Sequence, residues 1–207
     1  MTTIYTYNNK VLKNSSNDKW LKKYVDPYNP LGLAAYSMRL RLAQGTTFAG
    51  AGTAVCIDET NNIWDWTFGN GDAALAAKYT ANIVEVLGIN THGITDFRGV
   101  FNNCSNLITL PTNVYFGDGT EFSSFAYGCT SITTIPNYDL HSATNAFHMF
   151  NGCTNVESGV LTMYNQLSAL GTQITSHVDT FKNCGSNTTT GAAELAQIPA
   201  SWGGTGA

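Results

Sequence analysis

The sequence predicts an α+β protein built around a short solenoid of stacked repeats, with a β-rich N-terminal cap, a helical C-terminal cap and an extended N-terminal attachment segment. Three observations predict this class. A cysteine-centred segment recurs along the chain, alternating apolar and polar residues precede it, and helical apolar spacing follows its third copy. The predicted divisions are 1–30 for the attachment segment, 31–81 for the β-rich cap, 82–191 for the repeats with their capping helix and 192–207 for the C-terminal tail.

The N-terminal segment differs from the rest of the chain in charge. Half of all the Lys and Arg residues of the chain lie at or before Lys23. The stretch IYTYNNKVLKN predicts a β-hairpin turning at Asn8-Asn9, and Pro27 and Pro30 mark the passage into the body. So short a segment cannot bury a core of its own, so we expect it to dock on a larger assembly; the alternative is a first strand packed on the cap. The residues predicted to attach it are Tyr5, Tyr7, Lys10, Lys13, Trp20, Lys22 and Lys23.

The β-rich cap is predicted from alternation. In YSMRLRL the apolar side chains fall on one face and Arg39 and Arg41 on the other, which is typical of a half-buried strand. Trp64 and Trp66 are expected to close the core of this cap, and Cys56 belongs to it and not to the repeats. The predicted strands are 36–42, 53–59 and 62–69, the last two joined by an Asn61-Asn62 turn.

The repeats align on cysteine. The four copies are VFNNCSNLITLP (100–111), FAYGCTSITTIP (125–136), MFNGCTNVESGV (149–160) and the partial TFKNCGSNTTTG (180–191). An aromatic residue stands just before each cysteine: Phe101, Tyr127, Phe150 and Phe181. NIVEVLG (82–88) is an earlier copy that keeps the apolar strand expected after each cysteine but lacks the thiol. So regular a period predicts a solenoid, because each turn buries its apolar face only against the next.

The repeat cysteines are Cys104, Cys129, Cys153 and Cys184, and the last interval between them is longer than the first two, which are nearly equal. We interpret them as reduced thiols that form a buried structural ladder, because cysteine is small, apolar and readily buried. Disulfides between neighbouring turns and catalytic thiols are the alternatives; no histidine or other base recurs with the cysteines.

The C-terminal cap is predicted to be helical. SGVLTMYNQLSALG (158–171) has apolar residues at helical spacing, with Ser158 as N-cap and Gly171 as stop. A second short helix is expected over 192–199, ended by Pro199, with Trp202 folded back to cover it.

The pattern Phe-x-Asn/Gly-Cys-x-x-apolar-x-x-apolar-Pro resembles the BspA-like leucine-rich repeats, over residues 82–188. Two departures from that family stand out. YFGDGTEF (115–122) is an insertion, and Tyr127 stands one place away from the expected phenylalanine. The resemblance implies a solenoid that offers an extended recognition face.

The order of segments carries a second resemblance. The hairpin, the YNPLG joint, WDWTF, the repeats and the ending TTTGAAELAQIP-x-x-W are similar to virion fibre or appendage proteins of crAss-like bacteriophages that infect Bacteroides-type gut hosts. This resemblance implies a structural protein of the head or tail, assembled in the host cytoplasm and displayed on the particle exterior. Its implied partners are capsid or tail proteins through the N-terminal segment, host-surface glycans, and two further copies in a homotrimer.

Chemistry-bearing motifs give little support to an enzyme. No motif of a hydrolase, metalloprotease or nucleotide-binding protein occurs, so we expect no catalysis, cofactor or metal. Two weaker readings stay open: the loop Asp118–Glu121 as a cation site, and Asp65 between two tryptophans as a glycosidase carboxylate. A net charge of −4 does not favour nucleic-acid binding, and no apolar run is long enough to insert into a membrane.

Two other functions remain open from the sequence. A BspA-type bacterial surface adhesin is the main alternative, although no secretion signal is visible, and a carbohydrate-active enzyme is the weaker one. Charged residues make up only 12% of the chain, so the surface is expected to be rich in Thr, Asn, Ser and Gly. The candidate surface-binding residues are Thr109, Tyr115, Thr134, Tyr138 and His141.

Overall fold

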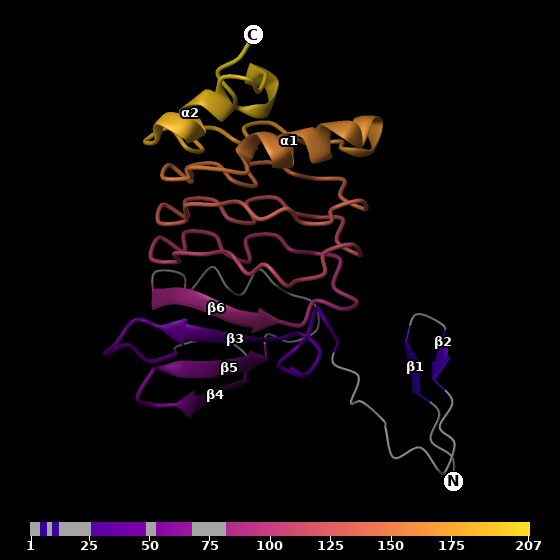
Figure 1. Cartoon of the computed structure of the whole chain (residues 1–207), viewed down its shortest axis with the longest axis vertical. Helices are drawn as coiled ribbons and strands as arrows, with labels where there is room; N and C mark the ends of the chain where they lie inside the picture. The colour runs from indigo at the N-terminus through magenta and orange to yellow at the C-terminus, as the bar shows by residue number, and fades with distance from the viewer. Residues whose placement is uncertain (1–4, 8–9, 13–25, 49–52, 68–81) are drawn as a thin grey trace.

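The computed structural model describes residues 5–7, 10–12, 26–48, 53–67 and 82–207. The α+β class is confirmed: a four-stranded antiparallel sheet lies in the N-terminal half, and two short helices lie toward the C-terminus. Irregular coils are stacked between them (Figure 1). The elements are β1 (Tyr5–Tyr7), β2 (Lys10–Leu12), β3 (Ser37–Leu42), β4 (Thr53–Asp58), β5 (Ile63–Thr67), β6 (Ile83–Ile89), α1 (Val160–Ala169) and α2 (Thr189–Leu195).

The predicted N-terminal hairpin is confirmed in its two strands. Strands β1 and β2 pair antiparallel, with Tyr7 opposite Lys10. The predicted turn residues between them, Asn8 and Asn9, lie outside the described residues. The hairpin forms a two-stranded sheet of its own, distinct from the sheet of β3 to β6.

The larger sheet has the strand order β4-β5-β3-β6. All three strands predicted for the cap are present, and the earlier apolar segment forms β6. The alternation in β3 is confirmed, because Met38, Leu40 and Leu42 are buried on one face. On the other face Arg39 donates two hydrogen bonds to Asp65, at 2.6 and 2.7 Å. Strand β6 lies at the end of the sheet nearest the coils, and the stack continues from it (Figure 1).

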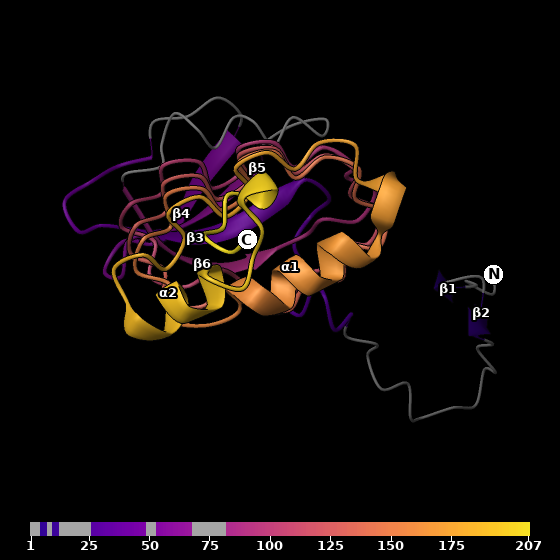
Figure 2. The ribbon, with the colours of Figure 1, turned by 90° about the horizontal axis from the view of Figure 1, so that it is seen from above.

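The coils are joined by a regular ladder of parallel backbone hydrogen bonds. Alternate N–H groups of 97–103 donate to carbonyls of 121–127, those of 122–128 to 145–151, and those of 146–152 to 176–182. Viewed along the stack, successive coils overlap (Figure 2). Equivalent positions on neighbouring coils therefore repeat at the spacing of the cysteines in the sequence, including the longer interval before Cys184.

Each coil makes its turns with two left-handed residues. One lies five positions before the cysteine and the other lies one position before it. Non-glycine residues rarely adopt this conformation, so their recurrence at equivalent positions shows that the stack imposes it. The residues are Gly99 and Asn103, Ser124 and Gly128, His148 and Gly152, and Asp179 and Asn183, with φ between 55° and 77°.

The alignment of Tyr127 with the buried phenylalanines is wrong. Tyr127 is 37% exposed, and Phe125 takes the interior place instead. The rings of Phe101, Phe125, Phe150 and Phe181 form a column, with neighbouring centroids 5.2, 6.2 and 6.1 Å apart. Phe125 reaches this column from one position earlier because the small Ala126 occupies the position equivalent to Phe101.

The apolar strands expected after each cysteine are largely absent. Leu107, Ile132 and Val156 are fully buried, as a repeat requires, but the described segments that carry them do not form β-strands. Thr134 and Ser158 make one isolated parallel bridge there. Backbone hydrogen bonds between coils are fewer here than along the cysteine-preceding segments: the N–H of Ile135 donates to Ser158 and that of Glu157 to Thr133, at 3.0 and 2.7 Å.

The four repeat cysteines are fully buried, and all five cysteines of the chain are free thiols. The Sγ atoms of Cys129 and Cys153 donate to the carbonyls of Phe101 and Ala126, at 2.9 and 3.0 Å. A hydrogen bond with Cys129, together with burial, raises the pKa of Cys104. Burial, together with a hydrogen bond to Cys184, raises the pKa of Cys153.

Alkylation of the native protein with iodoacetamide at about pH 8 is expected to modify Cys56 alone. Cys56 is half-buried on β4, whereas the repeat thiols lack both solvent access and, for Cys104 and Cys153, an accessible thiolate. Mass spectrometry of the intact and digested protein measures this. The unfolded protein in urea, in which all five thiols react, is the control, and rapid native labelling of Cys129 would contradict the buried column.

The two predicted helices are present with shifted ends. α1 begins after Gly159, which is the N-cap in place of Ser158, and Gly171 follows its C-terminus as predicted. α2 begins at Thr189 and not at 192, because the Thr188 side chain accepts a hydrogen bond from the N–H of Gly191 at 3.0 Å. Trp202 folds back, but onto Tyr164 of α1 and onto His177.

Candidate functional site

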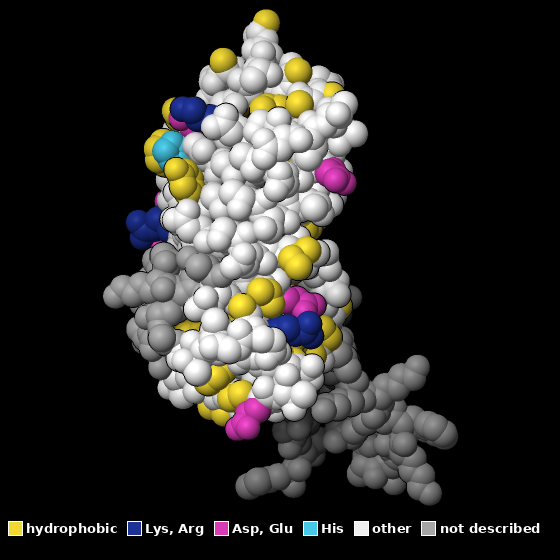
Figure 3. All heavy atoms as spheres, turned by 90° about the vertical axis from the view of Figure 1, so that its left-hand side faces the viewer, with side chains coloured by type: hydrophobic (Ala, Val, Ile, Leu, Met, Phe, Trp, Pro, Cys, Tyr) yellow, Lys and Arg dark blue, Asp and Glu magenta, His cyan; other side chains and the backbone are white. Residues whose placement is uncertain are grey.

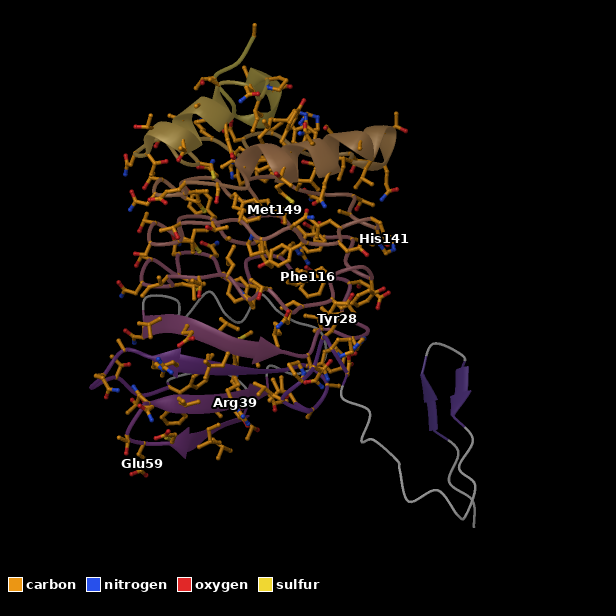
Figure 4. All side chains as sticks on the ribbon, viewed as in Figure 1. Tyr28, Arg39, Glu59, Phe116, His141 and Met149 are labelled. Carbon is orange, nitrogen blue, oxygen red and sulfur yellow. The ribbon has the colours of Figure 1, made fainter. Side chains whose placement is uncertain are left out.

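One edge of the stack gathers aromatic and carboxylate side chains from segments far apart in the sequence. They come from 26–28, 91–92, 115–118 and 137–141, with α1 beside them. Tyr28 and His141 lie along this edge in Figure 4, whereas Phe116 and Met149 lie inside the stack. The opposite side of the stack, which is on the left in Figure 1, has a described surface that is mostly neither charged nor hydrophobic (Figure 3).

Tyr115 is the centre of the aromatic part of the edge. Its ring centroid lies 5.6 Å from that of His92, nearly parallel to it, and 5.6 Å from that of Tyr28. Gly117 allows this placement, because a Cβ at that position would lie 2.7 Å from the Tyr115 ring. The Thr91 hydroxyl also donates to the Tyr115 carbonyl, so backbone and ring are both held.

The segment that carries Tyr28 is fixed to the edge by polar contacts. Asp26 Oδ2 lies 2.8 Å from His92 Nε2. The Asn29 side chain closes the following turn by bonding both the N–H and the carbonyl of Leu33, at 2.8 and 2.9 Å. Tyr28 itself remains 41% exposed. Two tyrosine rings and one imidazole therefore form a partly exposed cluster.

Carboxylates flank the aromatic cluster. The Tyr115 hydroxyl donates to Asp118 Oδ1 at 3.3 Å. Partial burial and the charges of Asp118 and Asp139 raise the pKa of Tyr115, so its hydroxyl stays protonated at neutral pH. Asp139 accepts from His141 Nδ1 at 2.8 Å, and this hydrogen bond is the main favourable cause that lowers the pKa of Asp139. Asp139 is thus ionised at neutral pH.

A pocket of about 180 Å³ continues the edge toward α1, and Asp139 belongs to both. Its lining residues are Asp139, Leu140, His141, Gln166 and Leu170. The Gln166 Nε2 donates to Asn137 Oδ1 at 2.6 Å, while its Oε1 is shielded from water and has no partner among the described residues. An unpaired buried acceptor is costly unless a donor reaches it. The pocket therefore offers hydrogen-bond acceptors beside two leucines.

The structure brings two of the five candidate surface residues, Tyr115 and His141, to this edge. Thr109 and Thr134 are exposed on the extended stretches after the cysteines, away from the aromatic cluster. Tyr138 is not a surface residue. It is 2% exposed, its ring packs 4.8 Å from that of Phe116, and its hydroxyl donates to the Pro111 carbonyl at 2.8 Å.

The insertion at 115–122 explains the inward position of Tyr138. Phe116, from the insertion, is buried and contacts the rings of Phe97, Phe122 and Phe125 as well as Tyr138. Burial raises the pKa of Tyr138 well above its ordinary value. The insertion thus supplies core aromatics together with the Tyr115 ring on the surface.

The two weaker sites suggested by the sequence do not assemble. Glu121 accepts from Ser123 N and Asn145 Nδ2, whereas Asp118 faces Tyr115. Within the described ranges no group of three or more His, Cys, Asp or Glu residues is arranged to hold a metal ion. Asp65 is paired with Arg39, and Trp66 is fully buried, so the WDW segment forms core as expected.

Only three of the predicted attachment residues are among the described residues. Tyr5 and Tyr7 belong to β1, and Lys10 belongs to β2. Lys13, Trp20, Lys22 and Lys23 lie outside the described residues.

A second exposed aromatic cluster is formed by the segments that precede Cys129 and Cys153 in the sequence. Phe147 stacks on His148 with centroids 3.7 Å apart, and Tyr127 lies 6.0 Å from His148. These residues give matched controls for the edge, because they are exposed rings on the same coils.

Sequence reasoning missed the contributions of Tyr28, His92, Asp139 and Gln166. The pair Asp139-x-His141 carries a weak local signal, since a carboxylate two residues before a histidine can bond its ring and N–H. The others come from separate segments and meet only in the fold.

No described helix has the length and apolar character needed to cross a membrane. Comparison with protein-family models, with curated proteins and with solved structures gives no match.

Proposed function

We propose that this chain is a structural virion protein of a bacteriophage, a head or tail fibre or appendage that displays its coil stack for binding host-surface glycans. The stack is interpreted as a short leucine-rich-repeat solenoid of the BspA-like type. The hydrogen-bonded ladder at the cysteine spacing supports this interpretation. The virion assignment rests on the resemblance in segment order, with a BspA-type bacterial adhesin as the alternative.

Glycan binding is supported by the edge described above. We call it the Tyr115 edge, and it consists of Tyr28, His92, Tyr115, Asp118 and the pocket around Asp139. Aromatic rings pack against the apolar faces of sugar rings, and carboxylate and amide oxygens accept hydrogen bonds from sugar hydroxyls. The edge provides both, with two tyrosines and a pocket that contains Asp139 and Gln166. The single observation that carries the proposal is this juxtaposition of partly exposed rings with a pocket of acceptors.

Substituting Tyr115 by alanine is expected to weaken binding to host capsular polysaccharide by about tenfold or more, because aromatic anchors dominate such interfaces. Biolayer interferometry with immobilised polysaccharide from the host measures this. Tyr127→Ala is the matched control, since Tyr127 is an exposed tyrosine on the next coil and outside the edge. Equal losses in both variants, or none in Tyr115→Ala, would contradict the assignment of the edge.

Attachment through the N-terminal segment is supported by its lysines and by the separate β1–β2 hairpin. Deleting residues 1–25 is expected to leave a folded body, because the deletion keeps Asp26 and its contact with His92. The truncated protein should be missing from purified phage particles, as measured by immunoblot against the full-length chain. Normal incorporation of the truncated protein would rule out this mode of attachment, and detection on uninfected bacterial surfaces would favour the adhesin.

A further inference from the structure

We infer that the Tyr115 edge selects uncharged, hydroxyl-rich sugar units and disfavours sugars that carry a carboxylate. This inference rests on the proposed glycan-binding function and adds the chemical class of the ligand. Three features of the edge carry it: the sign of its charges, the kind of hydrogen-bonding groups it offers and the size of its pocket.

The charges at the edge are predominantly negative. Asp118 and Asp139 both act electrostatically on the Tyr115 hydroxyl, and Asp26 lies on the far side of His92. Among the described residues, the ion pairs of the edge are His92–Asp26 and His141–Asp139, in which the cationic partner is a histidine and neither Lys nor Arg. A ligand carboxylate placed over Tyr115 therefore meets like charge.

The hydrogen-bonding groups of the edge are mostly acceptors. The carboxylates of Asp118 and Asp139 accept, and Gln166 Oε1 has no donor among the described residues. The Gln166 amide nitrogen is already directed to Asn137, so the acceptor oxygen is the group left for a ligand. Sugar hydroxyls donate as well as accept, whereas an ionised carboxylate only accepts.

The pocket is small for a ligand site. Its volume of about 180 Å³ lies below the ~300 Å³ lower limit that is usual for small-molecule pockets. It suits one unit of a chain, with Leu140 and Leu170 against the apolar face of the sugar ring and the neighbouring units over Tyr115 and Tyr28. The edge is open, so the polysaccharide can continue on both sides.

The test is an immobilised panel of neutral oligosaccharides, each paired with its C6-oxidised uronate form, probed with the full-length protein. Neutral members are expected to bind about fivefold or more tightly than their uronate partners at low salt, from the repulsion between exposed charges about 4 Å apart. This preference should diminish at high ionic strength. Equal or stronger binding of the uronate forms would overturn the inference while leaving glycan binding intact. Failure to bind any member of the panel would overturn both.

A charge variant sharpens the test. In Asp139→Asn the ratio of uronate to neutral binding is expected to rise about fivefold, because one of the repelling carboxylates is removed. Asp96→Asn is the matched control, since Asp96 pairs with Arg98 on the cysteine-preceding side of the coils. Both pairs are largely exposed, so neither variant should change the melting temperature appreciably. An unchanged ratio in Asp139→Asn would overturn the electrostatic basis of the selection.

Discussion

Substituting Phe150 by alanine is expected to lower the free energy of unfolding by about 3–5 kcal/mol. Phe150 is fully buried in the middle of the ring column, between Phe125 and Phe181. The coils on either side are fixed by backbone hydrogen bonds, so they cannot collapse to fill the cavity that alanine leaves. Since small domains are stable by about 5–15 kcal/mol, the loss is a large share of the total. Urea denaturation followed by tryptophan fluorescence measures it.

Phe147→Ala is the matched control for this prediction. Phe147 belongs to the same coil, but it is 36% exposed and stacks on His148 at the surface. Phe147→Ala should lower the free energy of unfolding by only about 0.5–1 kcal/mol, well below the loss expected for Phe150→Ala, because little buried volume is lost. Similar losses in the two variants would mean that the ring column does not hold the coils together.

The repeat spacing could be predicted from the sequence because cysteine marks a position with one steric requirement. A thiol, unlike a phenylalanine, cannot be replaced from a neighbouring position without changing the turn, so Cys104, Cys129 and Cys153 remain in register. Aromatic positions are less strict. Phe125 fills the ring column from a position one residue earlier than its equivalents. The aromatic residue nearest the cysteine in this copy is Tyr127, whose side chain faces outward, so aligning it with the phenylalanines was misleading.

The candidate site could be predicted only in part. Tyr115 and His141 are recognisable as polar aromatic residues in loops between repeats. Tyr138 satisfies the same criterion, but Phe116 of the insertion supplies an aromatic environment that turns its ring inward. Tyr28 and Gln166 lie toward opposite ends of the sequence, and no local pattern connects them. Their position on one edge follows from the stacking of the coils and from the placement of α1 across them.

The contact between α1 and the coils makes a second strong prediction at Gly159. This residue is the N-cap of α1 with a φ of 95°, and a Cβ placed on it would lie 2.2 Å from the Ile135 carbonyl oxygen. That oxygen is backbone and belongs to the preceding coil, so it cannot rotate away as a side chain could. Alanine would therefore force α1 away from the stack, which exposes the buried residues Val160, Met163 and Leu167.

Gly159→Ala is expected to lower the free energy of unfolding by about 2–5 kcal/mol, the sum of the left-handed backbone penalty of about 1–2 kcal/mol and an overpacking cost of about 1–3 kcal/mol. Gly171→Ala separates the two terms. Gly171 lies at the other end of α1 with a φ of 58°, but no described atom lies within 4 Å of a Cβ placed there, so only the backbone penalty applies. Urea denaturation of both variants measures the difference. Equal destabilisation would show that Gly159 serves the turn alone and that α1 does not press against the coil beneath it.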